Sequence, residues 1–255
     1  MKRYSTVHPL FMSFYSRSLY QDVAMNWRKI SILYLLLLLA VCLIPLTFKI
    51  RASVSDYLMH EAPKIVKQFP VVSISKGQVS VDVPMPYTIK DPENNAPFII
   101  IDTTGQVTSL AGSDALVLLT KTKLFFKRGP KESRILDLSD IDSLVIDQSM
   151  LYDWMETFIE YFAFVLYPVA LFFTFLFRIL QAIVFAVMAR SFNNYLKLNF
   201  RYSALLSLSI VSMTPAIIFD ALYNYFDMVI PFWWLIDFAL ALGYLFFALK
   251  SNAEE

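Results

Sequence analysis

A run of 19 residues without a charge, Ile30–Phe48, restricts this chain to a small set of folds. As an α-helix the run is about 28 Å long, close to the thickness of the hydrocarbon core of a bilayer. Lys49 and Arg51 follow it. A cleaved signal peptide is the alternative, but 29 residues precede the run and no clear small-residue cleavage site follows it. The sequence therefore predicts a retained transmembrane helix over residues 30–48.

Three further apolar regions have the length of a membrane-spanning helix if one internal charge is allowed in each. They cover residues 158–189, 203–222 and 230–249. Ile179–Ala189 is too short to cross a bilayer alone, so it either extends the second helix into the cytoplasm or lies in the interface as a re-entrant segment. The composition agrees with four spans, because only 17% of the residues are charged against about 25% in soluble domains. A water-soluble enzyme, a disordered chain and a disulfide scaffold are poor interpretations, the last because Cys42 is the single cysteine.

The distribution of basic residues predicts the orientation, since Lys and Arg accumulate near span ends on the cytoplasmic side. Nine basic residues fall on one side: Lys2, Arg3, Arg17, Arg28, Lys29, Arg190, Lys197, Arg201 and Lys250. Near the span ends on the other side there are only Lys49 and Arg51. Residues 1–29 and the tail 250–255 are therefore expected in the cytoplasm, and residues 52–150 outside it. The net charge of +1 gives no support for nucleic-acid binding.

The amino-terminal segment carries an apolar residue at every fourth position. Phe11, Tyr15, Leu19, Val23 and Trp27 form this stripe, which is typical of one face of a helix. The helix either lies in the inner headgroup region of the membrane or packs on the transmembrane helices from the cytoplasm. Both alternatives place it at the inner surface.

Residues 52–150 show a different pattern. Apolar residues at helical spacing continue to Phe69, with a kink or restart expected at Pro63 and a stop at Pro70. Beyond it the period is two, and Lys76-Gly77 predicts the turn of a β-hairpin. Further strands are expected at Tyr87–Ile89, Phe98–Ile101, Leu116–Thr120, Leu124–Lys127 and Arg134–Leu138, with turns at Asp91-Pro92, Thr104-Gly105 and Gly129-Pro130. The fold class predicted is an α-helical polytopic membrane protein with four transmembrane helices and an inserted extracytoplasmic α+β domain, mostly antiparallel β, between the first two.

The amino-terminal motif resembles that of an uncharacterised bacterial integral-membrane family of unknown function. The motif is SFYS-x-x-LY-x-x-V-x-x-x-W, from Ser13 to Trp27, and it precedes a leucine-rich span that ends Ile44-Pro45-Leu46. Further matches are Gly77, Pro86-Tyr87-Thr88-Ile89, Ile101-Asp102-Thr103-Thr104-Gly105, Leu118-Leu119-Thr120 and Pro231-Phe232. The resemblance implies a protein of the bacterial cytoplasmic (inner) membrane with an external domain, and it brings no activity, cofactor or catalytic residue. The last three spans are faintly similar to Yip-type membrane proteins.

Charged residues within or beside the apolar runs are the candidate site, because an ion in lipid needs a partner or a route to water. Asp220 ends the third span, and Asp237 is expected about 9 Å into the fourth from the same side. Glu156 and Glu160 begin the second span at that level, so four acids could share protons or a cation. Alternatively, Glu156, Glu160 and Asp220 are solvated helix ends, and Asp237 accepts hydrogen bonds from Tyr or Trp.

Arg178 is the single basic residue within the second apolar region, between Tyr161–Phe177 and Ile179–Ala189. It lies about 27 Å along the helix from Glu160, so we expect it near the inner interface with its guanidinium among the headgroups. A contact with a lipid headgroup or with a partner is the alternative. Gln181, three residues later, suggests an inward polar patch.

No catalytic, metal or cofactor site is expected. The two histidines, His8 and His60, are predicted on opposite sides of the membrane, and no nucleophile elbow, zinc-protease motif or phosphate-binding loop is present. The expected function is that of a non-enzymatic accessory or regulatory membrane protein whose external domain binds an envelope partner. The alternative is a small transport or lipid-handling component that uses the polar residues of the bundle. Besides the lipid bilayer, the expected partner is a membrane or envelope protein, and homo-oligomerisation is left open.

Overall fold

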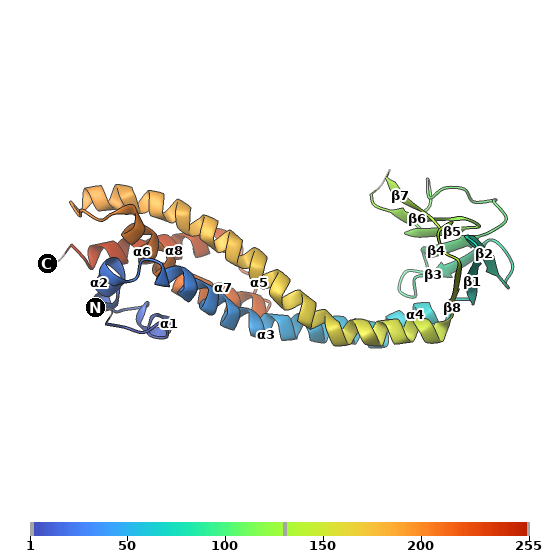
Figure 1. The fold of residues 1–255 in the computed structure, drawn as a ribbon, viewed down its shortest axis with the longest axis horizontal. Helices are drawn as coiled ribbons and strands as arrows, with labels where there is room; N and C mark the ends of the chain where they lie inside the picture. Colours follow the sequence, from blue (N-terminus) through green and yellow to red (C-terminus); the bar gives the residue numbers. More distant parts are fainter. Residues whose placement is uncertain (1–2, 130–131, 254–255) are drawn as a thin grey trace. The chain divides into compact units, whose positions relative to one another are not determined.

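The computed structural model describes residues 3–129 and 132–253. Lys2 of the basic count, Pro130 of an expected turn and the last two residues of the expected tail lie outside this range. Contacts divide the chain into a helical unit, Met1–Arg51 with Ala163–Glu255, and a β unit, Ala52–Phe162. Figure 1 shows the order of the elements, and each unit is described by itself.

Four helical segments are long and apolar enough to cross a membrane, as predicted: Ile30–Val66, Gln148–Tyr195, Tyr202–Tyr225 and Trp233–Lys250. They are made of α3 (Ile30–His60) with α4 (Ala62–Val66), α5 (Gln148–Tyr195), α6 (Tyr202–Ser212) with α7 (Thr214–Tyr225), and α8 (Trp233–Lys250). Since about 20 residues span the hydrocarbon core, only part of the 31-residue α3 and the 48-residue α5 can lie in it. Ile179–Ala189 continues α5 as a helix and does not turn back.

The third segment is divided at Met213, which ends α6 and precedes α7. Pro215 occupies the first turn of α7, where its missing N–H costs nothing. In the interior of the helical unit, buried hydroxyl groups form hydrogen bonds with one another. Tyr34 and Thr214 are joined by a hydrogen bond of 2.8 Å, and Ser31 donates to Ser207 at 3.2 Å. These pairs connect α3 to α6 and α7.

The amino-terminal stripe does not form a single helix. The segment folds into α1 (Pro9–Met12) and α2 (Arg17–Asn26), and Ser16 caps α2 by accepting from the Leu19 N–H. As a result Phe11 and Tyr15 are 71% and 68% exposed, while Leu19, Tyr20 and Val23 of α2 are fully buried against the other helices.

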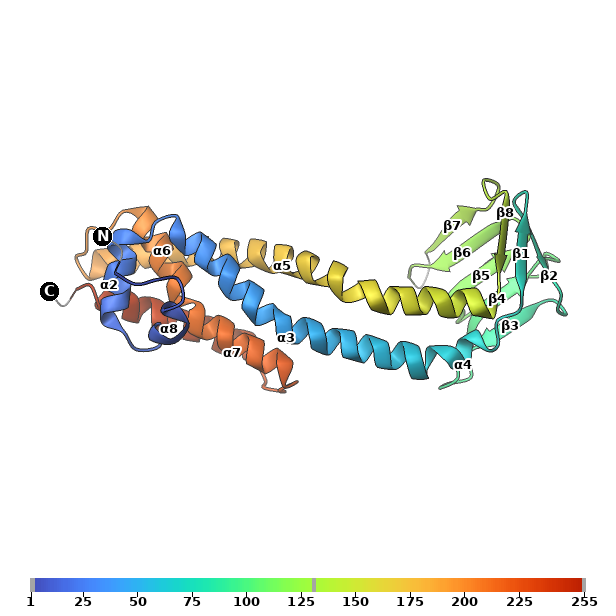
Figure 2. The same cartoon turned by 60° about the horizontal axis from the view of Figure 1, so that its bottom comes forward.

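The second alternative for this segment therefore agrees with the structure: α2 packs on the other helices of the unit. In both views α2 lies beside α6 and α8 (Figures 1 and 2). Asp22 fastens the preceding chain by accepting from the N–H groups of Arg3 and Tyr4 at 3.0 and 3.2 Å.

Among its described residues, the β unit contains eight strands in two sheets. One sheet has the order β2-β1-β8 and the other β3-β4-β5-β6-β7, and every pair is antiparallel except β4 with β5. The strands are β1 Val72–Ser75, β2 Gln78–Val81, β3 Tyr87–Lys90, β4 Pro97–Asp102, β5 Val117–Thr120, β6 Lys123–Lys127, β7 Ser133–Asp137 and β8 Ser143–Ile146. The predicted hairpin and the five further strands are confirmed, and β8 was not predicted.

The turn of the hairpin requires glycine. Gly77 has a φ of +75°, and an added Cβ would lie 2.7 Å from the backbone Cα of Ser139. The central part of the five-stranded sheet is buried on both faces, one against Val72, Ile74 and Val79 of the smaller sheet, the other beneath a loop containing Leu110 and Ala115. Its two edge strands, β3 and β7, differ in what covers them.

Candidate functional site

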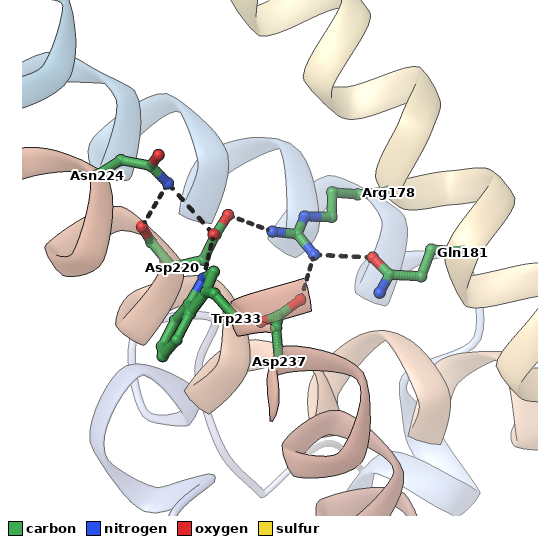
Figure 3. Close-up of polar contacts among 6 residues, drawn as sticks. All are labelled: Arg178, Gln181, Asp220, Asn224, Trp233 and Asp237. Carbon is green, nitrogen blue, oxygen red and sulfur yellow. Dashed lines mark hydrogen bonds and ion pairs between the residues drawn. The ribbon is translucent and has the colours of Figure 1, made fainter. Parts of the chain in front are cut away.

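Three of the five candidate residues meet in the helical unit, from three different helices (Figure 3). Arg178 of α5 is 6% exposed. Its Nη2 donates to Oδ2 of Asp220 in α7 at 2.7 Å, and its Nη1 lies 3.6 Å from Oδ2 of Asp237 in α8. Nη1 also donates to Oε1 of Gln181 at 2.8 Å. One guanidinium thus ties α5 to α7 and α8, and we call Arg178, Asp220 and Asp237 the charged cluster.

The two aspartates of the cluster differ in their partners. Asp220 also accepts from the indole Nε1 of Trp233 at 3.1 Å and from Nδ2 of Asn224 at 3.2 Å. Asp237 has only the longer contact to the arginine, and its buried Oδ1 accepts no hydrogen bond from the described residues. Two carboxylates and one guanidinium leave a formal charge of −1 if both acids are ionised. Asp220 is therefore the closed half of the cluster, and Asp237 the half with free hydrogen-bonding capacity.

A second candidate site lies at one edge of the five-stranded sheet. All five residues of β7 are exposed, and among them Ile135 and Leu136 are 55% and 48% exposed. A hollow of about 460 Å³ beside the strand is lined by Phe126, Lys127, Arg128, Arg134 and Leu136. Apolar and basic side chains thus share one accessible surface, which we call the β7 edge, Ser133–Asp137 with this hollow.

The comparison with known proteins places the chain in a family. The chain belongs to DUF1189, described as a protein of unknown function. The match covers residues 7–249, which include the charged cluster and the whole β unit. It confirms the resemblance to a family of unknown function. No curated protein and no solved structure matches the chain.

In this DUF1189 chain, Arg178 is not separated from the two aspartates along the helices, as the expected positions near opposite ends of the spans implied. Its guanidinium is buried and bonded to Asp220, so it is level with the two aspartates. The reason is that an ion without water is stabilised by an opposite charge within hydrogen-bond distance. The expected indole donor exists, but Trp233 donates to Asp220 and not to Asp237.

Glu156 and Glu160 lie in the β unit, in the part of α5 that precedes Ala163. Of the proposed set of four acids, the helical unit holds Asp220 and Asp237, with Arg178 between them. The participation of the two glutamates stays a prediction.

Asp102 is the fully buried acid of the β unit, and it holds a turn. Its Oδ1 accepts from the N–H of Thr104 at 2.8 Å and from the Thr104 hydroxyl at 2.6 Å, and Oδ2 accepts from the Val107 N–H. Burial alone would raise the pKa of Asp102, but these bonds to the ionised form outweigh it and lower the pKa below its usual range. The expected strand ending in a turn is confirmed here, and this carboxylate is fully occupied.

The described residues contain no group of three His, Cys, Asp or Glu side chains that could hold a metal ion. Two features of DUF1189 in this chain therefore carry chemistry of interest: the charged cluster and the β7 edge. Sequence reasoning named every member of the first and missed the second. The signal for the second was the basic composition around Lys127 and Arg134, but the sequence does not say which strand of a sheet is at its edge.

Proposed function

We propose that this protein is a non-enzymatic accessory or regulatory protein of the bacterial inner membrane. Its helices anchor it in the bilayer with both termini in the cytoplasm, and its β unit lies on the extracytoplasmic side and binds an envelope protein. The observation that carries the proposal is the β7 edge, which exposes apolar and basic side chains together. Exposed apolar residues grouped on one surface are typical of protein interaction sites.

The orientation is supported by the nine basic residues near the span ends on one side. Reporter fusions test it directly. A reporter inserted near Asn95 should be active only outside the cytoplasm, and one fused after Glu255 only inside. Activity of both reporters in the same compartment would contradict the orientation.

Photo-crosslinking in intact cells tests the binding function. A photoreactive amino acid is placed in the full chain at Ile135, on the β7 edge, and as a control at Lys90, in the strand at the opposite edge of the same sheet. We expect the Ile135 position to yield a discrete adduct with an envelope protein, identified by mass spectrometry. Deletion of residues 70–148 also removes the probe position, so it is tested by co-purification, and it should abolish capture of the partner. If no position on the β unit yields an adduct, the proposal is wrong.

A second candidate function, transport or lipid handling, is favoured by one observation. Asp237 keeps a buried oxygen without a hydrogen-bond partner among the described residues, next to a buried arginine. Intramembrane charges often mark ion or substrate paths. Asp237→Asn distinguishes the two functions. An accessory protein should keep its crosslink to the partner in this variant, whereas a transporter should lose activity while it remains folded and inserted.

A further inference from the structure

The two edges of the five-stranded sheet differ in whether their outward backbone groups have hydrogen-bond partners among the described residues. At the β3 edge, the side-chain amide of Gln68 acts like a neighbouring strand. It donates from Nε2 to the carbonyl of Lys90 at 2.9 Å and accepts at Oε1 from the Lys90 N–H at 3.0 Å. The backbone groups at the end of β3 are therefore satisfied within the chain.

At the β7 edge the backbone is open. The Arg128 N–H donates to the carbonyl of Glu132, and the Leu138 N–H donates to the carbonyl of Thr122. With the register of β6 and β7, these bonds direct the backbone groups of Arg134 and Leu136 toward β6. The N–H and C=O groups of the alternate residues Ser133, Ile135 and Asp137 then point outward. In the part of the chain that the structure describes, no group bonds to them.

The charge around this open edge has one dominant sign. Between Lys121 and Asp137 the sequence has six basic residues and two acidic ones. Three of the basic residues, Lys127, Arg128 and Arg134, line the hollow beside Phe126 and Leu136. An extended segment lying along β7 would therefore meet positive charge on one face and the Ile135 side chain on the other, because successive side chains of a strand point to opposite faces.

We propose that the β7 edge takes up an extended acidic segment of the partner protein as an added strand. The outward N–H and C=O groups would supply the backbone hydrogen bonds, and the basic hollow would select acidic side chains. This inference rests on the proposed function and names the chemistry of its partner. Acidic residues of the segment are expected beside Arg134 and not beside Asp137, which carries the opposite charge.

A simpler explanation of the charges is that they protect an edge from aggregation, since lysines are common at free edges. That explanation does not account for the apolar residues. Ile135 and Leu136 are about half exposed in the edge strand itself. Exposed apolar side chains promote association, so they are not expected at an edge whose charges serve only to prevent it. The combination of open backbone, apolar side chains and positive charge favours a specific strand.

The test uses the full-length protein in detergent micelles and a fluorescent short peptide of alternating glutamate and valine. Binding is measured by fluorescence anisotropy. Two control peptides are used: one has lysine in place of glutamate, and one is N-methylated at alternate backbone positions. We expect the acidic peptide to bind, and both control peptides to bind at least tenfold more weakly, the lysine peptide by charge repulsion and the methylated one by loss of backbone donors.

Matched variants locate the site. Arg134→Gln should weaken binding about fivefold, as expected for the loss of one exposed ion pair. Lys90→Gln removes the same charge at the opposite edge and should change nothing. Ile135→Pro removes an outward N–H without removing a bond to β6, and should weaken binding about tenfold or more.

Amide hydrogen exchange at residue resolution distinguishes an added strand from a purely electrostatic contact, because only the strand would slow exchange at alternate backbone amides. On adding the acidic peptide, exchange should slow at Ser133, Ile135 and Asp137, while Arg134 and Leu136, already bonded to β6, stay unchanged. This alternation supports the added strand. Equal binding by Arg134→Gln and Lys90→Gln, protection without alternation, or binding only to anionic phosphatidylglycerol vesicles would each overturn it. If the peptide fails while the crosslinks from the β unit persist, the proposed function stands and only this inference is lost.

Discussion

Two buried charged residues of the helical unit and the β7 edge of the β unit differ in how their polar groups are satisfied. In the helical unit, the buried Arg178 and Asp22 are held by partners from within the chain. In the β unit, the outward backbone of β7 has no partner among the described residues. An unpaired polar group is costly in lipid or in a packed core but can be hydrated at a wet surface. The closed networks therefore hold the fold together, whereas the open edge can accommodate another molecule.

The largest expected effect comes from opening the charged cluster. Arg178→Met leaves the 31% exposed Asp220 side chain and the 13% exposed Asp237 side chain without their counter-charge, which should cost about 3 kcal/mol, the low end of the range for breaking a buried pair. We expect a strong loss of thermal stability of the helical unit in detergent, or failure to accumulate folded protein. Arg190→Met is the control, because Arg190 is an exposed arginine of the same helix. Equal effects of the two substitutions would mean that the cluster is not a closed network.

The second effect concerns the closed network at Asp22. Its carboxylate also accepts from Nδ2 of Asn26 at 2.8 Å and Nε1 of Trp27 at 2.9 Å. Asp22→Asn should destabilise the docking of the amino-terminal segment by about 2–3 kcal/mol, because bonds to a charged acceptor are lost. The measurement is amide exchange at Arg3 and Tyr4. Asp153→Asn, at an exposed position, is the control.

The same network makes the docking depend on pH. Burial alone would raise the pKa of Asp22, but the hydrogen bonds from Arg3, Trp27, Asn26 and Tyr4 outweigh it and lower the pKa. Since the folded-state pKa lies below the unfolded value of about 3.9, the stabilisation is complete above that pH. It is lost as the pH falls through the folded-state pKa. The protection factor at Arg3, which is the intrinsic exchange rate divided by the observed rate, should therefore fall only in acid, and a fall on raising the pH above neutrality would contradict this assignment.

Most secondary structure could be predicted from the sequence because it follows from local periodicity. The four apolar helices and seven of the strands needed only hydropathy, alternation and turn residues. The amino-terminal stripe shows the limit of this reasoning. Its spacing of four is equally good throughout, but Ser16 caps a new helix, so that Phe11 and Tyr15 leave the buried face. Local hydrogen bonding overrode the periodicity.

The charged cluster could be predicted only in part, because its members come from distant parts of the chain. Asp220 and Asp237 were expected together since a short connection joins their helices. Arg178, 42 residues before Asp220, was expected at the other side because helix length was counted from Glu160. Because α5 has 48 residues and is longer than a membrane span, the distance from Glu160 does not determine which end of the span Arg178 lies near. The β7 edge was missed because strand order depends on pairing between distant segments, which alternation along one strand does not encode.

The difference between the two sheet edges can be tested by removing the side chain that satisfies the backbone at the β3 edge. Gln68→Ala removes the amide that satisfies Lys90 and should destabilise the β unit by about 1 kcal/mol. Amide exchange at Lys90 should accelerate, while exchange at Ile135 stays as it was. Gln106→Ala, at an exposed position, is the control. If Lys90 remains protected in the variant, the edge is covered by something other than Gln68.

The smallest effect is expected within the charged cluster itself. Asp220 receives hydrogen bonds from Arg178, Trp233 and Asn224, whereas Asp237 lies 3.6 Å from the arginine, beyond a strong hydrogen bond. Asp237→Asn should therefore change stability by less than about 1 kcal/mol, because it removes a buried charge that has little compensation. Asp220→Asn should cost about 2–3 kcal/mol, because it weakens bonds to a charged acceptor. Thermal unfolding of the two variants in the same detergent measures the difference, and equal losses would show that Arg178 depends on both carboxylates alike.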